Sequence, residues 1–176
     1  DNETAQIAVQ ASLTGHLVMS TLHTNSAVGA ITRLRDMGLE PFLLASSLLG
    51  VVAQRLVRRL CPHCARPFPL EESHLPLFHF LPEPPSSVFK AVGCSHCHFT
   101  GYKGRAAIHE CMVVDNAIRQ AIHENQDEFS IENIHRKTAR SLRENGLLKA
   151  ISGETTLEEV IRVTAEQEIA TQGTIS

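Results

Sequence analysis

The sequence predicts an α/β fold with a metal-binding insert and a helical last third. Three observations favour this class. A short, dense apolar run at 16–23 lies between two helical stretches, as a buried strand of a doubly wound sheet does. Two Cys-x-x-Cys pairs bracket a proline-rich insert, and the residues after 115 carry helix caps followed by helically spaced apolar side chains.

Composition limits the class of protein. The 176 residues fit one ordinary domain, or a core piece with a small appendage. The formal net charge of -3 argues against a mainly electrostatic nucleic-acid binder, so we expect no nucleic-acid partner. The longest apolar run, 42–53, contains two serines and a glycine and is shorter than the about 20 residues of a membrane span. Any membrane association is therefore expected to be peripheral.

The first elements read as helix, strand and helix. The apolar residues of 3–13 predict a mostly buried helix, and 16–23 predicts a fully buried parallel strand. A second helix is expected from Ala27 to about Met37. Because ligands of such sheets bind beyond the carboxyl ends of strands, the polar residues there are candidates: Ser20, Thr21, His23, Thr24 and Asn25.

The middle of the chain should be less regular. Pro41 opens an apolar helix to about Gln54, and 55–60 extends towards the first cysteine pair. The basic residues of that stretch either contact phosphate or an acidic partner, or form a solvated face: Arg55, Arg58 and Arg59. The insert 66–85 holds six of the eight prolines and should be irregular, with at most one short helix near 71–80.

A glycine-rich turn at 101–105 leads into an extended stretch, 106–114. Cys111 lies in that stretch, and we interpret it as a buried free thiol. The alternative is a catalytic cysteine with His109, two residues away, as its base.

The last third predicts three helices. Asp115 can cap 116–125, and Ser130 starts a helix that ends near Asn145-Gly146. Thr155 or Thr156 caps a final helix. The tail after Glu168 is expected to fray.

The two cysteine pairs predict a structural metal site. Cys61-Pro62-His63-Cys64 and Cys94-Ser95-His96-Cys97 each place two thiolates where they can hold one ion. Four thiolates complete the tetrahedron that Zn²⁺ prefers and leave no open position for catalysis. The alternatives are two disulfides or four unrelated thiols. We call each Cys-x-x-Cys turn a knuckle. A histidine in or beside a knuckle could also replace a thiolate as ligand, although surface positions fit these residues better: His63, His96 and His98.

Composition and spacing do not indicate a catalytic activity, because the sequence contains no GxxxxGK[ST] loop, GxGxxG turn or HExxH helix. Resemblance to a known family indicates a function. Gly15–Asn25, GHLVMSTLHTN, resembles the histidine box of the secretion-ATPase superfamily, which drives type II secretion, type IV pilus assembly and pilus retraction. Glu3–Ala8 resembles the segment after that family's Walker B element, with Asp1 as the last residue of the element.

Other segments point to one branch of this superfamily. Ala53–Val57 followed by Cys61 resembles the start of the family's zinc-binding subdomain, which the retraction motors typically lack, so this match points to the pilus-assembly and type II branches. Ala27–Gly38 and Phe42–Leu49 look most like the type II secretion branch. The resemblance covers the chain up to about Thr164.

The resemblance implies a cytoplasmic, hexameric ATPase with a RecA-like core, peripheral at the inner membrane. ATP and Mg²⁺ would be its cofactors, and inner-membrane platform proteins that extend a pseudopilus would be its partners. His23 would sense or polarise the γ-phosphate region, and His16 would be structural. Arg105 could contact nucleotide or a neighbouring subunit.

The family's phosphate loop, acidic box and Walker B glutamate would precede Asp1, so we expect a carboxyl-terminal fragment that is inactive alone. The expected parts are half of the RecA-like core at 1–60, the zinc-binding subdomain at 61–104, a helical subdomain at 105–168 and the tail at 169–176. The alternatives are a pilus-assembly ATPase and a zinc-stabilised binding module without nucleotide chemistry.

Overall fold

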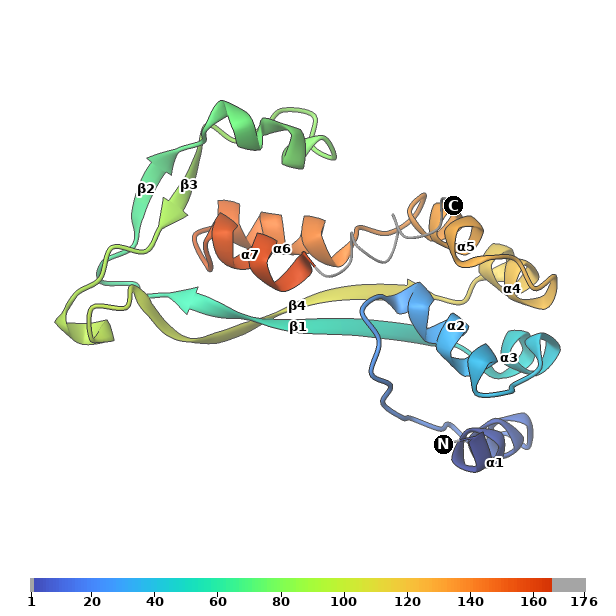
Figure 1. Ribbon diagram of the computed structural model, residues 1–176. Helices are drawn as coiled ribbons and strands as arrows, with labels where there is room; N and C mark the ends of the chain where they lie inside the picture. Colours follow the sequence, from blue (N-terminus) through green and yellow to red (C-terminus); the bar gives the residue numbers. More distant parts are fainter. Residues whose placement is uncertain (1, 166–176) are drawn as a thin grey trace. The chain divides into compact units, whose positions relative to one another are not determined.

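The computed structural model describes residues 2–165, and its helices and strands confirm the α/β class (Figure 1). The chain forms two compact units. Unit 1 comprises Asp1–Ala53 and Glu110–Ala139, and unit 2 comprises Gln54–His109 with the described residues from Arg140 onward. The four-part division expected from the sequence stays a prediction, and its tail, 169–176, lies outside the described residues.

The described strands form two two-stranded sheets, with helices before, between and after them along the chain. β1 pairs with β4, and the two arrows run in opposite directions in Figure 1. β2 pairs antiparallel with β3, with Phe68 opposite Val88. In chain order the elements are α1 (Asn2–Leu13), α2 (Ala27–Asp36), α3 (Pro41–Ser47), β1 (Gly50–Leu60), β2 (Arg66–Pro69), the 3₁₀ helix η1 (Glu72–Phe78), β3 (Ser87–Lys90), the 3₁₀ helix η2 (Ser95–Cys97), β4 (Tyr102–Val113), α4 (Asn116–His123), α5 (Glu128–His135), α6 (Leu142–Ile151) and α7 (Leu157–Thr164).

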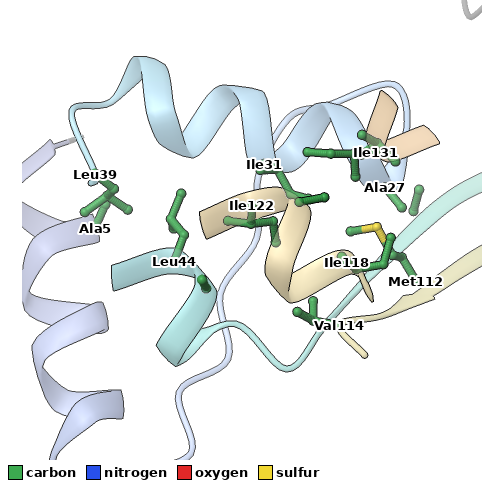
Figure 2. Packing of buried hydrophobic residues seen from close by; sticks show 14 residues of the cluster. Ala5, Ala27, Ile31, Leu39, Leu44, Met112, Val114, Ile118, Ile122 and Ile131 are labelled. Carbon is green, nitrogen blue, oxygen red and sulfur yellow. The ribbon is translucent and has the colours of Figure 1, made fainter. Parts of the chain in front are cut away.

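Unit 1 is built around one apolar cluster. Figure 2 shows Ile31 of α2, Leu44 of α3 and Ile122 of α4 turned towards a common centre. Each such side chain contributes about 1.5–3 kcal/mol when fully buried. Side-chain caps fix where the helices begin: Ser26 accepts from Gly29 N at 2.9 Å, and Asp115 accepts from Ile118 N at 2.9 Å. The second helix and the cap of α4 are as predicted.

Unit 2 has two apolar clusters that bring α6 and α7 against its strands. One joins Val57 of β1, Ile108 of β4 and Leu142 of α6. The other places η1 and β3 on the last two helices, and its buried members are Phe78, Val88, Leu147, Ala150, Leu157 and Val160. Thr156 caps α7 by accepting from Glu159 N at 3.2 Å, as predicted. The short helix expected in the proline-rich insert is η1.

The prediction of a buried strand at 16–23 is wrong. These residues form no strand, and Leu17 and Met19 are 77% and 89% exposed. A parallel strand is stable only between neighbouring strands with helices on both faces, and no described strand pairs with 16–23. The helix before it forms at 2–13, but only Ala5 is buried, so the mostly buried helix is also wrong.

The third helix ends earlier than predicted, at Ser47 rather than near Gln54. α3 stops at Ser47, and β1 begins at Gly50. Ser46 and Ser47 donate their hydroxyls to the carbonyls of Phe42 and Leu43, a local pattern that favours helix ends, and the chain then enters a strand.

The single helix expected at 130–145 is two helices, α5 and α6. Asp127 caps the first of them, accepting from Ser130 N at 2.9 Å. Ser141 and Glu144 form a reciprocal capping box that starts the second. The capping box interrupts the apolar stripe that the sequence suggested.

Candidate functional site

Four cysteine sulfurs gather in unit 2. All four Sγ atoms lie within 4.8 Å of one another, with Cys61, Cys64 and Cys97 buried and Cys94 half-buried. The pairs Cys61–Cys94 and Cys64–Cys97 are separated by 3.9 and 3.8 Å. A tetrahedron with zinc–sulfur bonds of about 2.3 Å has sulfur–sulfur edges of about 3.8 Å, whereas a disulfide bond is about 2.05 Å long. The cluster therefore fits a metal ion and contains no disulfide.

The backbone around the sulfurs is arranged for thiolates. Gly93 N donates to Cys64 Sγ at 3.3 Å, and Cys94 N and Gly101 N each donate to Cys97 Sγ at 3.2 Å. Burial raises the pKa of the Cys64 thiol, to about 11. Burial alone would also raise the pKa of Cys97, but the two N–H donors and the neighbouring thiols lower it to about 6. Four thiolates so close together repel one another unless a cation compensates them, as a bound divalent metal does.

Two glycines permit the second knuckle to fold. Gly93 has φ +103°, and a Cβ there would lie 2.7 Å from the carbonyl oxygen of Phe99. Gly101 has φ +78°, and its Cβ would lie 2.5 Å from the Ala91 Cβ. Gly101 O also accepts from Cys61 N at 2.9 Å, which ties the two knuckles together.

The knuckle histidines lie outside the sulfur cluster. His63 and His96 are exposed and stack on each other, with ring centroids 4.1 Å apart. Within 2–165, the metal-holding group contains cysteines alone. His98 is exposed and has φ +52°, which turns the chain at the end of η2.

The histidine-box residues lie in unit 1. His16 Nδ1 lies 3.2 Å from Ala11 O and 3.2 Å from Thr14 Oγ1, so its ring closes the end of α1. His23 is exposed, in the irregular segment before α2. Arg105 is exposed on β4 in unit 2. Their proposed roles stay predictions.

Two of the basic residues before the first knuckle have acidic partners within unit 2. Arg58 Nη2 lies 2.7 Å from Glu159 Oε2, and Arg59 Nε lies 3.8 Å from Glu154 Oε1. The guanidinium of Arg58 also covers the Tyr102 ring, 4.1 Å from its centroid.

Cys111 is exposed, so the prediction of a buried thiol is wrong. Side chains alternate along β4, and this alternation buries Glu110 and Met112 on the inner face. Sequence reasoning missed Glu110, which is fully buried. Its Oε1 lies 2.8 Å from Arg136 Nη2 and 3.3 Å from His135 Nε2, within unit 1. Alternation of buried and exposed side chains along the strand, starting from the apolar Ile108, would have predicted that Glu110 is buried.

Comparison with known proteins assigns the family. Residues 1–162 match the family described as type II/IV secretion system protein. The chain belongs to this family. Secretion system proteins match at high identity over nearly the whole chain. Type II secretion system protein E of Aeromonas hydrophila is 58% identical over 166 residues, which is 94% of this chain and 33% of that protein. Type II secretion system ATPase E of Vibrio cholerae is 57% identical over 166 residues, again 94% and 33%.

The chain thus spans about a third of the length of the curated relatives it matches. In solved structures, the fold resembles the crystal structure of the pilus retraction motor PilT with bound ADP. The TM-score is 0.63 at 22% identity, over 98% of this chain and 39% of that one. This likeness concerns the fold alone, and it agrees with the mixed helix and strand class expected from the sequence. Among the described residues of this family member, no helix has the length and apolar character needed to cross a bilayer.

Proposed function

We propose that this chain is the carboxyl-terminal part of an ATPase that powers type II secretion. The observation that carries the proposal is identity above 55% to type II secretion proteins E along 94% of the chain. The clustered cysteines support the type II secretion and pilus-assembly branches over the retraction motors, because the resemblance places the tetracysteine subdomain in those two branches. The whole protein would be a cytoplasmic hexamer, peripheral at the inner membrane. It would act on the inner-membrane platform that extends a pseudopilus.

The chemistry would be phosphoryl transfer from ATP to water with Mg²⁺. Such a reaction needs held phosphates, an oriented water and positive charge on the transition state, and little covalent chemistry from the protein. His23 would approach the γ-phosphate region. Its exposure leaves the ring free to meet a nucleotide bound by residues outside this chain. Arg105 would supply positive charge to nucleotide or to a neighbouring subunit. The 176-residue chain by itself would hydrolyse little ATP.

The four cysteines would hold a structural Zn²⁺ ion: Cys61, Cys64, Cys94 and Cys97. The sulfur separations of 3.8 and 3.9 Å support a tetrahedral site. Zinc would supply no catalytic step, because four sulfur ligands leave no open position. Its effect would be to join the ends of the proline-rich insert and so fix β2 and β3.

The test compares two histidine variants in a longer protein that contains this chain and an upstream phosphate loop. His23→Ala should lower the ATPase rate by about 100-fold, as loss of one group that stabilises transition-state charge does. His16→Ala is the matched control, because the His16 ring lies against the end of α1. Equal rates for the wild type and His23→Ala would remove His23 from the mechanism. A longer protein that neither binds nor hydrolyses ATP would favour the zinc-stabilised binding module instead.

A further inference from the structure

Unit 1 contains a hollow between α3 and α4. Its volume is about 500 Å³, and it is open to solvent rather than enclosed. Small residues of α3 form one side, and polar residues of α4 form the other. The lining residues are Ala45, Ser46, Asn116, Arg119, Gln120 and His123.

The polar side of the hollow is one face of α4. Its four residues are spaced i, i+3, i+4 and i+7, so they project from the same side of the helix. The opposite face, with Ile118 and Ile122, is buried in the unit 1 core (Figure 2). This burial fixes the rotation of α4 about its axis. The polar face therefore lies at the surface, where it lines the hollow.

The hollow contains a cation that lacks a counter-ion. Arg119 Nη2 donates to Val114 O at 3.2 Å, which anchors the guanidinium. Arg119 Nε is buried and finds no hydrogen-bond partner among the described residues. No carboxylate among residues 2–165 lies within ion-pair distance of Arg119. The Arg119 side chain as a whole is half-buried and lines the hollow, so its guanidinium can meet an anion there.

The neighbouring acid is already engaged. Glu124 accepts from Gln120 Nε2 at 2.8 Å and from Gln126 Nε2 at 2.9 Å. The Gln120 hydrogen bond is the main cause that lowers the pKa of Glu124, and the His123 charge adds to it. Glu124 is not part of the lining. The hollow thus presents a guanidinium, two side-chain amides and an imidazole, and no carboxylate.

We propose that this hollow binds the phosphate group of a small organic phosphate, with Arg119 as the principal anion contact. A planar guanidinium matches the oxygens of phosphate. Asn116 and His123 provide further donors, which suit the three oxygens of a phosphate monoester better than the two of a carboxylate. The remaining volume, over Ala45, accommodates the organic part. Neither His23 nor Arg105 lines the hollow, so this site is independent of the proposed ATP chemistry.

The experiment is an NMR titration of the zinc-loaded 176-residue chain with inorganic phosphate, phenyl phosphate and benzoate at constant ionic strength. Saturable shifts are expected at the Arg119 Nε–H and at the side-chain amides of Asn116 and Gln120. Phenyl phosphate should bind about tenfold tighter than benzoate, a difference of one decade in Kd. If benzoate binds equally well, the assignment to phosphate is overturned. If no saturable shift occurs at these residues, the site itself is overturned.

Charge-matched variants test the anion contact. Arg119→Gln should weaken phenyl phosphate binding by about tenfold or more. Arg33→Gln removes the same charge at an exposed position of α2 outside the hollow, and should leave the affinity unchanged. His123→Gln, at an exposed position, gives a second variant that keeps the core intact. Equal loss in Arg119→Gln and Arg33→Gln would mean unspecific attraction and would overturn the proposal.

Discussion

The carboxylate of Glu159 in α7 accepts two hydrogen bonds from the Arg58 guanidinium of β1, at 3.0 and 2.7 Å. Arg58 N donates to the same carboxylate at 3.1 Å, and Arg162 donates to both oxygens at 3.1 and 2.7 Å. Glu159 itself is only 1% exposed. One buried carboxylate therefore holds the final helix against a strand of unit 2.

We expect Glu159→Gln to lower the free energy of unfolding by about 1–3 kcal/mol, because the hydrogen bonds from Arg58 and Arg162 lose their charged acceptor. The exposed guanidinium groups place the value towards the lower end of this range. Glu158→Gln removes the same charge one position earlier, at an exposed site, and is the control. Urea unfolding followed by circular dichroism measures both. Equal midpoints for the two variants would contradict this role of Glu159.

The same carboxylate predicts how stability depends on pH. Burial alone would raise the pKa of Glu159, but the hydrogen bonds from Arg162 and Arg58 lower it to about 2. An unfolded glutamate titrates near pH about 4.3. The unfolded chain therefore binds the proton first as pH falls, so the stabilisation is complete above about pH 5 and is lost towards pH 2. The stability difference between wild type and Glu159→Gln should shrink over this interval in urea titrations. If the stability difference between the two proteins stays constant down to pH 2, the lowered pKa of Glu159 is not the cause of the stabilisation.

Metal binding separates the five cysteines into two classes. Cys94→Ser should lower zinc content and thermal stability together, because the site loses one of four ligands. Cys111→Ser removes an exposed thiol outside the cluster and should change neither quantity. Elemental analysis and thermal unfolding measure the two effects. Unchanged zinc content in Cys94→Ser would show that Cys94 is not a required ligand.

Local signals in the sequence were sufficient for several features. The side chains of Asp115 and Thr156 mark helix starts, and the Cys-x-x-Cys spacing brings four sulfurs together. Such signals act over a few residues, so they can be recognised without knowledge of the fold. The capping box of Ser141 and Glu144 is also a local signal, because its two residues lie three positions apart.

Long-range features were harder to predict. The apolar run at 16–23 has the composition of a buried strand, but whether it forms one depends on neighbouring strands, which are absent from residues 2–165. The partners of Glu110 lie 25 and 26 positions later, in His135 and Arg136. No local pattern connects those residues. Only the fold of unit 1 brings them together.

The Glu110 contacts give a prediction for unit 1. Glu110→Ala should destabilise the protein by about 1–3 kcal/mol, because Arg136 and the buried His135 both lose the carboxylate between them, while Glu132 still pairs with Arg136. Glu132→Ala is the control, since it removes the other, partly exposed carboxylate on Arg136 and keeps Glu110 in place. The control should lose about 1 kcal/mol or less. Urea unfolding measures both variants, and equal losses would show that burial of Glu110 adds nothing.

The second knuckle provides a matched pair of glycines. Gly101 and Gly104 have nearly the same φ, +78° and +79°, so alanine at either position pays a similar left-handed penalty of about 1–2 kcal/mol. Only at Gly101 would the new Cβ meet other atoms, at 2.5 Å from the Ala91 Cβ, whereas nothing lies within 4 Å at Gly104.

Gly101→Ala should therefore lose stability well beyond Gly104→Ala, by a further about 1–3 kcal/mol from the steric overlap. It should also bind zinc more weakly, because Gly101 N donates to Cys97 Sγ and its carbonyl accepts from Cys61 N. Competition with a zinc chelator and thermal unfolding measure the two effects. If both variants retain zinc equally and unfold at the same temperature, the close packing of Gly101 against Ala91 does not hold the knuckles together.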